Sequence, residues 1–401
     1  MNLKIQYESF AVFFILIIFV SYQFLPPAIS MAITVLAIGL FFNSSRSSNL
    51  YLLKLTMPLL LIPFIAMAGL FENRSIYNIA KDIWYFVNPI IIIFAGFYVG
   101  SKVRNKDRLI WLVISLGLFL SIKFIYDYNT IGFSGANDYK AIRDEVGKSS
   151  YLSVFALVFI IEKIKNSKLE RNIALSIAAI FILLSISLSF SRTMWVITFL
   201  SVVIINLRFL GVSLYKKLVI TSFIVVTASF ILFSLEGTTF YNKLIFSLQE
   251  VSSTQHWTLV DINERWRAYE THRAMSEYFA SNNLELFIGK GAGYLLDLKI
   301  LMDLGGESFK YIPILHNGFA FLLLKTGAAG LLCYLIFFVN LFNSTINRIC
   351  YSQDLFIFVL VIIMLLTTFV ISGLYNKQAL SQMIFFIGVA ISFKLRKVEL
   401  L

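Results

Sequence analysis

Apolar segments long enough to cross a lipid bilayer recur along almost the whole chain. A transmembrane helix needs roughly 20 mostly apolar residues, and 59% of the 401 residues are hydrophobic while only 14% are charged. This composition excludes an ordinary soluble globular domain. The apolar runs predict about 12 spans, at 9–24, 28–42, 51–70, 83–100, 109–125, 150–161, 173–190, 194–207, 218–234, 327–342, 354–373 and 379–394.

The distribution of lysine and arginine predicts which side of the membrane each loop faces. If the N-terminus is inside, the inside segments carry eighteen of these residues and the short outside loops carry eight. Positive residues gather on the cytoplasmic side, so both termini are expected in the cytoplasm. The net charge of +12 then comes mostly from basic residues on the cytoplasmic side that face anionic lipid headgroups. No nucleic-acid partner is expected.

One long polar loop interrupts this pattern and contains every histidine of the chain. These histidines are His256, His272 and His316. The predicted fold class is therefore an all-α polytopic membrane protein with one long external loop that contains short helices. Three parts follow: spans one to nine with short loops (1–235), the candidate catalytic loop (236–316), and a membrane-surface helix with the last three spans (317–401).

A single charged residue marks the turn between two predicted spans. Between Arg171 and Arg208 lie 36 residues, of which only Arg192 is charged. That stretch is too long for one span, so the chain is expected to turn near Arg192 at the outer surface. The residue either ends a helix as a snorkelling side chain or presents a fixed cation to an anionic headgroup, because its planar fork suits phosphate oxygens.

The long loop contains a predicted amphipathic helix that is rich in arginine and aromatic residues. Its sequence, Asn-Glu-Arg-Trp-Arg-Ala-Tyr-Glu-Thr-His-Arg, begins at Asn263, which is expected to cap the helix. Arg265 and Arg267 are candidate substrate-binding residues, with solvated helix charges as the alternative. Arg273 has ion-pair spacing to the acidic residues on both sides of it.

Three glycines at alternate positions follow this helix. Gly289, Gly291 and Gly293 permit positive φ angles or a close approach of another backbone. They form either a tight turn beneath the loop or a phosphate cradle, and the cradle is the weaker interpretation because no strand–loop–helix context is assured.

The loop closes at His316, directly before an apolar stretch. Lys325 and Gly327 break this stretch, which predicts a short helix in the outer leaflet ahead of the tenth span. His316 then lies at the lip of the membrane. Histidine is the side chain best suited to moving a proton near pH 7, although a lone histidine is often structural. Neither the histidines nor the two cysteines have metal-ligand spacing, so no metal or other cofactor is expected.

Taken together, these motifs resemble the O-antigen ligase and O-antigen polymerase superfamily. The resemblance covers roughly 173–345 and rests on order: Ser-Arg-Thr between two spans, an arginine–aromatic helix opening a long external loop, Gly-x-Gly, and His-Asn-Gly before an apolar helix. It implies a metal-independent glycosyltransferase of the bacterial inner membrane whose long loop is periplasmic. The implied partners are a glycan donor on undecaprenyl pyrophosphate, a glycan acceptor, the bilayer and a chain-length regulator.

The resemblance also implies roles for individual residues. Arg192 and Arg265 match the arginines thought to hold the pyrophosphate. The alignment is uncertain by one helical turn, and Arg267 is the alternative to Arg265. His316 matches the histidine proposed to activate the acceptor hydroxyl, and Asn317 follows it in the motif. Two fixed cations would stabilise the leaving group without a metal.

Three functions remain open at this point. A polymerase joins one lipid-linked glycan to another, and it is favoured because the glycine segment and the outer loop 126–149 offer room for a second glycan. A ligase, the first alternative, transfers the glycan to the lipid A core. A 12-helix transporter or flippase is the second, although charged residues that would mark an ion pathway are few, with Lys54, Lys81 and Asp82 near span ends.

Overall fold

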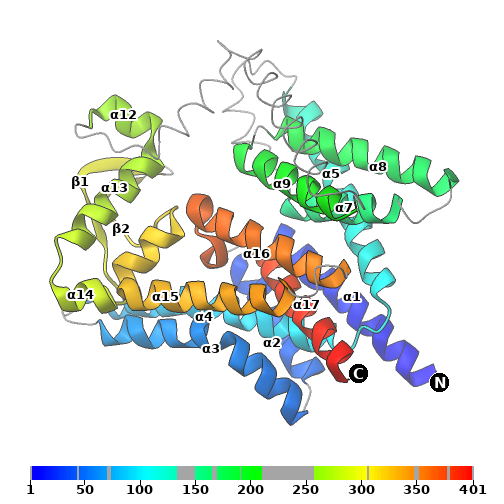
Figure 1. The fold of residues 1–401 in the computed structure, drawn as a ribbon. Helices are drawn as coiled ribbons and strands as arrows, with labels where there is room; N and C mark the ends of the chain where they lie inside the picture. The colour runs from blue at the N-terminus through cyan, green and yellow to red at the C-terminus, as the bar shows by residue number, and fades with distance from the viewer. Residues whose placement is uncertain are drawn as a thin grey trace. The chain divides into compact units, whose positions relative to one another are not determined.

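The structure is a computed structural model. It describes residues 2–42, 45–69, 74–132, 150–164, 169–189, 191–209, 257–304, 307–346, 352–376 and 380–399. The chain forms two compact units: unit 1 comprises residues 1–17 and 103–245, and unit 2 comprises residues 18–102 and 246–401. Each unit is described by itself, and their elements are labelled in Figure 1.

Unit 1 is a helical bundle built around one helix that is buried over most of its length. It contains the first part of α1 (Asn2–Phe24), with α5 (Lys106–Gly132), α7 (Tyr151–Ile164), α8 (Leu169–Leu188) and α9 (Arg192–Phe209). Every residue from 151 to 160 of α7 is buried, and α7 packs against α5, α8 and α9. Gly117 lets α5 and α7 approach closely, since a Cβ there would lie 2.4 Å from that of Ala156.

Unit 2 contains most of the helices that carry the candidate site. They are α2 (Pro27–Phe41), α3 (Arg46–Ala68), α4 (Ile76–Gly100), α15 (Gly318–Ile346), α16 (Ser352–Ile371), the 3-10 turn η1 (Gly373–Tyr375) and α17 (Ser381–Glu399). Glycines allow α4 and α17 to pack backbone to backbone. A Cβ on Gly96 would lie 2.0 Å from Phe385 O, and one on Gly388 would lie 2.0 Å from Ile93 O. Small residues at helix contacts are typical of membrane proteins, where lipid supplies no hydrophobic drive between helices.

Among the residues that the structure describes, five helices are long and apolar enough to cross a membrane. They cover Tyr7–Phe24, Arg46–Ala68, Ile76–Gly100, Lys106–Thr130 and Gly318–Asn343. Large apolar side chains remain exposed on them, as at Phe64 of α3, which is 71% exposed. The protein is therefore mostly helical and membrane-embedded. Other predicted spans coincide with shorter helices, and the predicted span 218–234 lies outside the described residues. The number of twelve spans stays a prediction.

The described part of the long loop contains the predicted short helices and, in addition, a two-stranded hairpin. It contains the short helices α12 (Leu259–Glu264), α13 (Trp266–Phe279) and α14 (Asn283–Ile288), followed by strands β1 (Leu296–Leu304) and β2 (Glu307–Ile312). The strands pair antiparallel, with Leu296 opposite Ile312. The register shifts between Asp297 and Met302, where Lys299 has a φ of 60°. The short helices predicted in the long loop are confirmed, and the hairpin was not predicted from the sequence, because strand character in so short a pair depends on pairing.

A break in α15 confirms the predicted interruption ahead of the tenth span. Gly327 has φ 61° and ψ −165°, which is not helical, so Gly318–Ile346 consists of two helices joined at a kink. A Cβ at Gly327 would lie 2.4 Å from Phe287 O, so α14 packs directly on the kink. Only glycine combines this backbone conformation with this close approach.

Candidate functional site

His316 forms a hydrogen-bonded pair with Glu270 in unit 2. His316 Nδ1 lies 2.7 Å from Glu270 Oε2, and the same oxygen accepts the His316 backbone N–H at 3.3 Å. The Glu270 side chain is 3% exposed, whereas that of His316 is 45% exposed. When Glu270 is ionised it can only accept, so Nδ1 carries a proton, and in the neutral imidazole Nε2 then keeps its lone pair. Within the described part of the chain, Nε2 makes no hydrogen bond. The histidine therefore presents a proton acceptor outward from a buried carboxylate.

The backbone around His316 is fixed by the segment that follows α16. Ser372, in the left-handed region at φ 68°, donates its N–H to His316 O at 2.7 Å and its hydroxyl to Leu315 O at 2.7 Å. Asn317 is buried, and its Oδ1 accepts the N–H groups of Phe319 (3.0 Å) and Ala320 (3.2 Å). These are the donors that an N-cap satisfies. Asn317 thus acts as the helix cap of α15, and its predicted substrate contact stays a prediction.

Helix α13 is anchored to the hairpin, which holds Glu270 in place. Tyr269 Oη donates to Leu298 O at 2.5 Å, and burial raises the pKa of the Tyr269 phenol. Arg273 donates to Asp297 O through Nε (3.2 Å) and Nη2 (3.1 Å) and pairs with Glu277 at 3.1 Å. The predicted pair between Arg273 and Glu277 is confirmed, whereas Glu270 bonds to His316.

The start of this helix lies elsewhere than predicted. Asn263 is inside α12, whose cap is Thr258: its hydroxyl accepts the Asp261 N–H, and the Asp261 carboxylate accepts from Thr258. Those hydrogen bonds lower the pKa of Asp261. Arg265 stands at the break between α12 and α13, with φ −122° and ψ 42°. The prediction that Asn263 caps one continuous helix was wrong, because the capping box three residues apart outweighs a single asparagine.

The predicted substrate-binding arginines occupy different positions. Arg267 lies in the first turn of α13, three residues before Glu270, so both project from one face of the helix. Arg265 precedes that helix and is partly buried. Arg192 is the first residue of α9 and belongs to unit 1, where α8 ends at Leu188; the predicted turn near Arg192 is confirmed, and its side chain lies outside the described residues. His256 also lies outside them.

The glycine segment is a fully bonded turn. The N–H groups of residues 289 to 293 donate in order to Glu285 O (2.7 Å), Leu324 O (2.8 Å), Lys325 O (2.9 Å), Ala66 O (2.8 Å) and Asp82 Oδ2 (2.6 Å). Gly289, Gly291 and Gly293 all have positive φ. A phosphate cradle needs N–H groups that point at the ligand, and here each one is already used. The interpretation as a phosphate cradle is therefore wrong and the tight turn is correct, while room for a second glycan at this segment stays a prediction.

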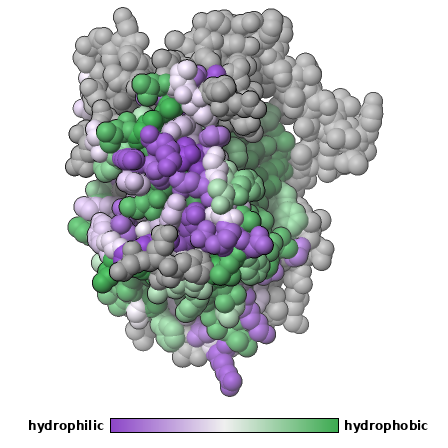
Figure 2. Space-filling view, turned by 90° about the vertical axis from the view of Figure 1, so that its left-hand side faces the viewer, coloured by the Kyte–Doolittle hydropathy of each residue, from purple (hydrophilic) through white to green (hydrophobic). Residues whose placement is uncertain are grey.

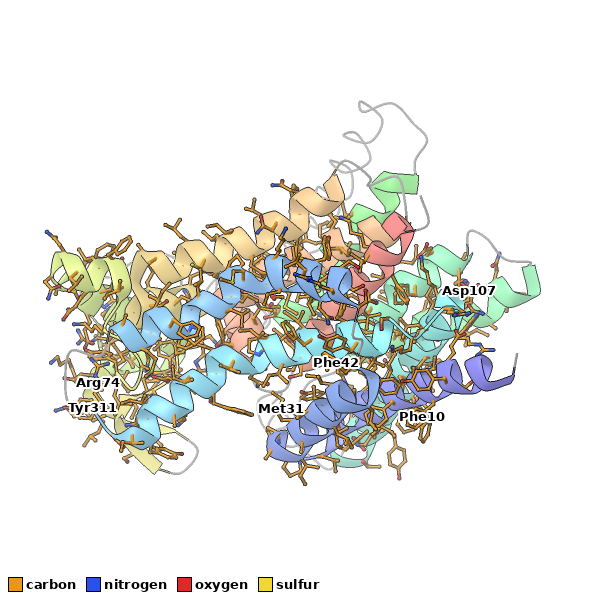
Figure 3. The ribbon with its side chains drawn as sticks, turned by 90° about the horizontal axis from the view of Figure 1, so that it is seen from below. Phe10, Met31, Phe42, Arg74, Asp107 and Tyr311 are labelled. Atoms are coloured by element: carbon orange, nitrogen blue, oxygen red, sulfur yellow. The ribbon has the colours of Figure 1, made fainter. Side chains whose placement is uncertain are left out.

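A buried ion pair lies beneath this turn. Lys325 donates to Asp82 Oδ2 and to Tyr294 O, and the side chains of Asp82 and Lys325 are 1% and 2% exposed. Arg74 Nη1 closes the turn from the other side by donating to Gly291 O (3.1 Å) and Ala292 O (3.0 Å). Figure 3 shows Arg74 at the start of α4, at the same end of unit 2 as Tyr311 of β2. In the sequence, Asp82 was one of the few charged residues that could support a transporter. In the structure it connects α4 to the glycine turn and to α15.

Hydrophilic side chains gather on the face of unit 2 that carries these loop elements (Figure 2). Figure 2 shows this face, with a hydrophilic area in its middle and hydrophobic areas on either side. Among the described residues, no group of three or more His, Cys, Asp or Glu side chains is placed to hold a metal ion.

Comparison with known proteins adds no family. No protein-family model matches the chain, and no curated protein matches its sequence. The function is therefore argued from the geometry described above.

Two side-chain pairs of the candidate site had no usable signal in the sequence. Glu270 and His316 are 46 residues apart, and Asp82 and Lys325 are 243 residues apart. No local periodicity links such pairs. A charged residue inside an apolar stretch, such as Lys325, is itself a signal that a partner is needed, but it does not say which one.

Proposed function

We propose that the protein is a membrane glycosyltransferase that joins undecaprenyl-pyrophosphate-linked glycan units, as an O-antigen polymerase does. The observation that carries the proposal is the pair of His316 with buried Glu270, at the start of the helix that leads into a membrane-crossing segment. A glycosyl pyrophosphate is already activated. Transfer then needs a base for the acceptor hydroxyl and positive charge for the leaving group.

The pair suits the first of these tasks. Glu270 holds the ring with Nε2 outward, so an acceptor hydroxyl within reach of Nε2 loses its proton as it attacks the anomeric carbon of the donor. The bond from that carbon to the pyrophosphate oxygen breaks, and the leaving group takes the electron pair. Attack from the side opposite the leaving group inverts the anomeric centre. The histidine then returns its proton to solvent.

Arginines suit the second task. Arg267 projects from the helix face that carries Glu270, and Arg192 and Arg265 are the further candidates. Guanidinium groups stay charged and bind phosphate oxygens in pairs of hydrogen bonds. This chemistry needs no metal, and localisation in the bacterial inner membrane with a periplasmic loop belongs to the same proposal.

A ligase that transfers the glycan to the lipid A core is the second candidate, because it shares the donor and the base. One reason for preferring a polymerase, room for a second glycan at the glycine segment, stays a prediction, although the N–H groups of the turn itself are all bonded within the protein. The other, the outer loop 126–149, lies largely outside the described residues. The acceptor therefore separates the two functions experimentally.

The test uses purified protein with undecaprenyl-pyrophosphate glycan extracted from the cells that make it, in the presence of EDTA. A polymerase extends the glycan into a ladder without any other acceptor. A ligase gives product only when core lipopolysaccharide is added. His316→Ala is expected to lower transfer by ~10²–10⁴-fold, the usual contribution of a general base. A requirement for added metal would refute the arginine-based mechanism. Full activity of His316→Ala would show that His316 is not the general base.

A further inference from the structure

Trp266 shares a helix face with the residue that holds His316. It is the first residue of α13, and Glu270 follows four positions later. Side chains four residues apart on a helix lie one above the other on the same side. The Cα atoms of Trp266 and Glu270 are therefore about one helical turn apart, roughly 6 Å along the axis. Arg267 is three residues from Glu270 on the same face.

The position of Trp266 is set by a rigid aromatic neighbour. Its ring centroid lies 6.3 Å from that of Tyr269, which is buried and tied through its hydroxyl to Leu298 O. Trp257 packs on the same tyrosine at 5.4 Å and on His272 at 5.7 Å. Both indoles are partly exposed. The two tryptophans differ in position. Trp266 is part of α13 and shares the helix face of Glu270, whereas Trp257 lies before α12.

We propose that Trp266 forms a binding subsite for a pyranose ring of the glycan beside His316, an inference that rests on the proposed function. The apolar C–H face of a sugar ring lies flat against the indole, and the hydroxyls at its edge remain for polar neighbours such as Arg267. An indole suits this role because it offers a large, rigid apolar area at low entropic cost. Trp266 is thus a residue that sets affinity for the glycan, while His316 carries the proton.

Kinetics separate this role from a structural one. Trp266→Ala is expected to raise KM for the glycan roughly three- to tenfold, the worth of one aromatic contact, with kcat changed less than about twofold. Trp266→Phe keeps an aromatic ring, so its KM should lie between those of the unaltered protein and Trp266→Ala. Trp257→Ala is the matched control, because it removes an equal indole from the same tyrosine and should leave KM unchanged. An equal rise of KM in both alanine variants, or a fall in kcat alone in Trp266→Ala, would overturn the proposal.

A binding measurement keeps the inference separate from the proposed activity. Trp84, Trp111 and Trp195 are replaced by Phe in a His316→Ala background, so that Trp257 and Trp266 alone report by fluorescence. The probes are the extracted lipid-linked glycan, the free glycan released from it by mild acid, and inorganic pyrophosphate. We expect both glycans to change the emission, and the change to disappear with Trp266→Phe and persist with Trp257→Phe. Pyrophosphate alone should have no effect through Trp266.

The outcomes of the two experiments are distinguishable. Glycan binding that depends on Trp266 without transfer by the unaltered protein would sustain the subsite and defeat the proposed function. Transfer by the unaltered protein with no glycan-induced change in Trp266 emission would defeat the subsite and leave the function standing.

Discussion

At the scale of single residues, the exposed face of His316 depends on a carboxylate that is almost entirely buried. One oxygen of Glu270 receives two donors from His316, the ring and the backbone N–H. The backbone contact matters because it is independent of the ring's protonation. It fixes where the oxygen lies, and the oxygen in turn decides which ring nitrogen holds the proton.

Replacing Glu270 tests this arrangement. Glu270→Ala is expected to lower transfer by about 10²-fold or more, because the loss of a histidine's carboxylate partner can cost up to ~10⁴-fold. Glu270→Gln should retain more activity than Glu270→Ala, since the backbone N–H of His316 draws the amide oxygen to the same place, where it still accepts from Nδ1. The measurement is kcat in the EDTA assay at equal amounts of folded protein. Wild-type kcat in Glu270→Ala would show that the pair is structural.

The role of a residue could be predicted from the sequence only where its type or its spacing allows few roles. The rarity of histidine pointed to His316, and spacing gave the pair of Arg273 with Glu277. The partner of His316 could not be found this way, because Glu270 had an equally good local partner in Arg273. The fold decides between them by anchoring Arg273 on Asp297 O.

At the scale of elements, the buried pair of Asp82 and Lys325 ties three segments together. Asp82 Oδ2 also accepts the Gly293 N–H, and Lys325 also donates to Tyr294 O. Helix α4, the glycine turn and the kinked α15 therefore meet at two side chains. The same kink separates the helix that starts beside His316 from the helix that follows Gly327.

A double-mutant cycle tests the coupling. Asp82→Leu and Lys325→Met should each destabilise the protein by about 3–5 kcal/mol, because each leaves the other charge buried without its partner. The double variant should cost less than the sum, since it leaves no unpaired charge, although Gly293 N–H and Tyr294 O then lack their bonds. The measurement is unfolding in detergent, with Lys299→Met, an exposed lysine on the hairpin, as control. Strictly additive losses would show that the two side chains act independently.

Helix positions were predictable because apolar length is a property of the local sequence. The structure has helices at nearly all the predicted spans that it describes. The hairpin was missed because β1 and β2 are short and their strand character depends on pairing, with α13 fixed to β1 through Leu298 O. Pairing of this kind is a tertiary effect that propensity does not capture.

At the scale of the whole molecule, the orientation in the membrane is the prediction on which the proposed chemistry depends. The excess of positive residues on one side places the long loop outside. Lys310 lies on β2 and is exposed, so a cysteine there reports the side without disturbing a core contact.

The experiment places Lys310→Cys in a Cys333→Ser, Cys350→Ser background and applies an impermeant thiol reagent to intact spheroplasts. Labelling before lysis is expected. A cysteine at Arg104, between α4 and α5, is the opposite control and should react only after lysis. The reverse pattern would put the loop in the cytoplasm, where no lipid-linked periplasmic glycan can reach His316.

The glycine turn has a consequence for how this loop moves. Turns usually exchange their amide hydrogens with solvent quickly, because their N–H groups open with little loss of contact. In residues 289 to 293 every N–H is committed to α3, α4, α14 or α15, so these amides should exchange as slowly as those of the helices around them. Local opening of the external loop would then stop at this turn, and α12, α13 and the hairpin could rearrange around a substrate while the helices below stayed in register.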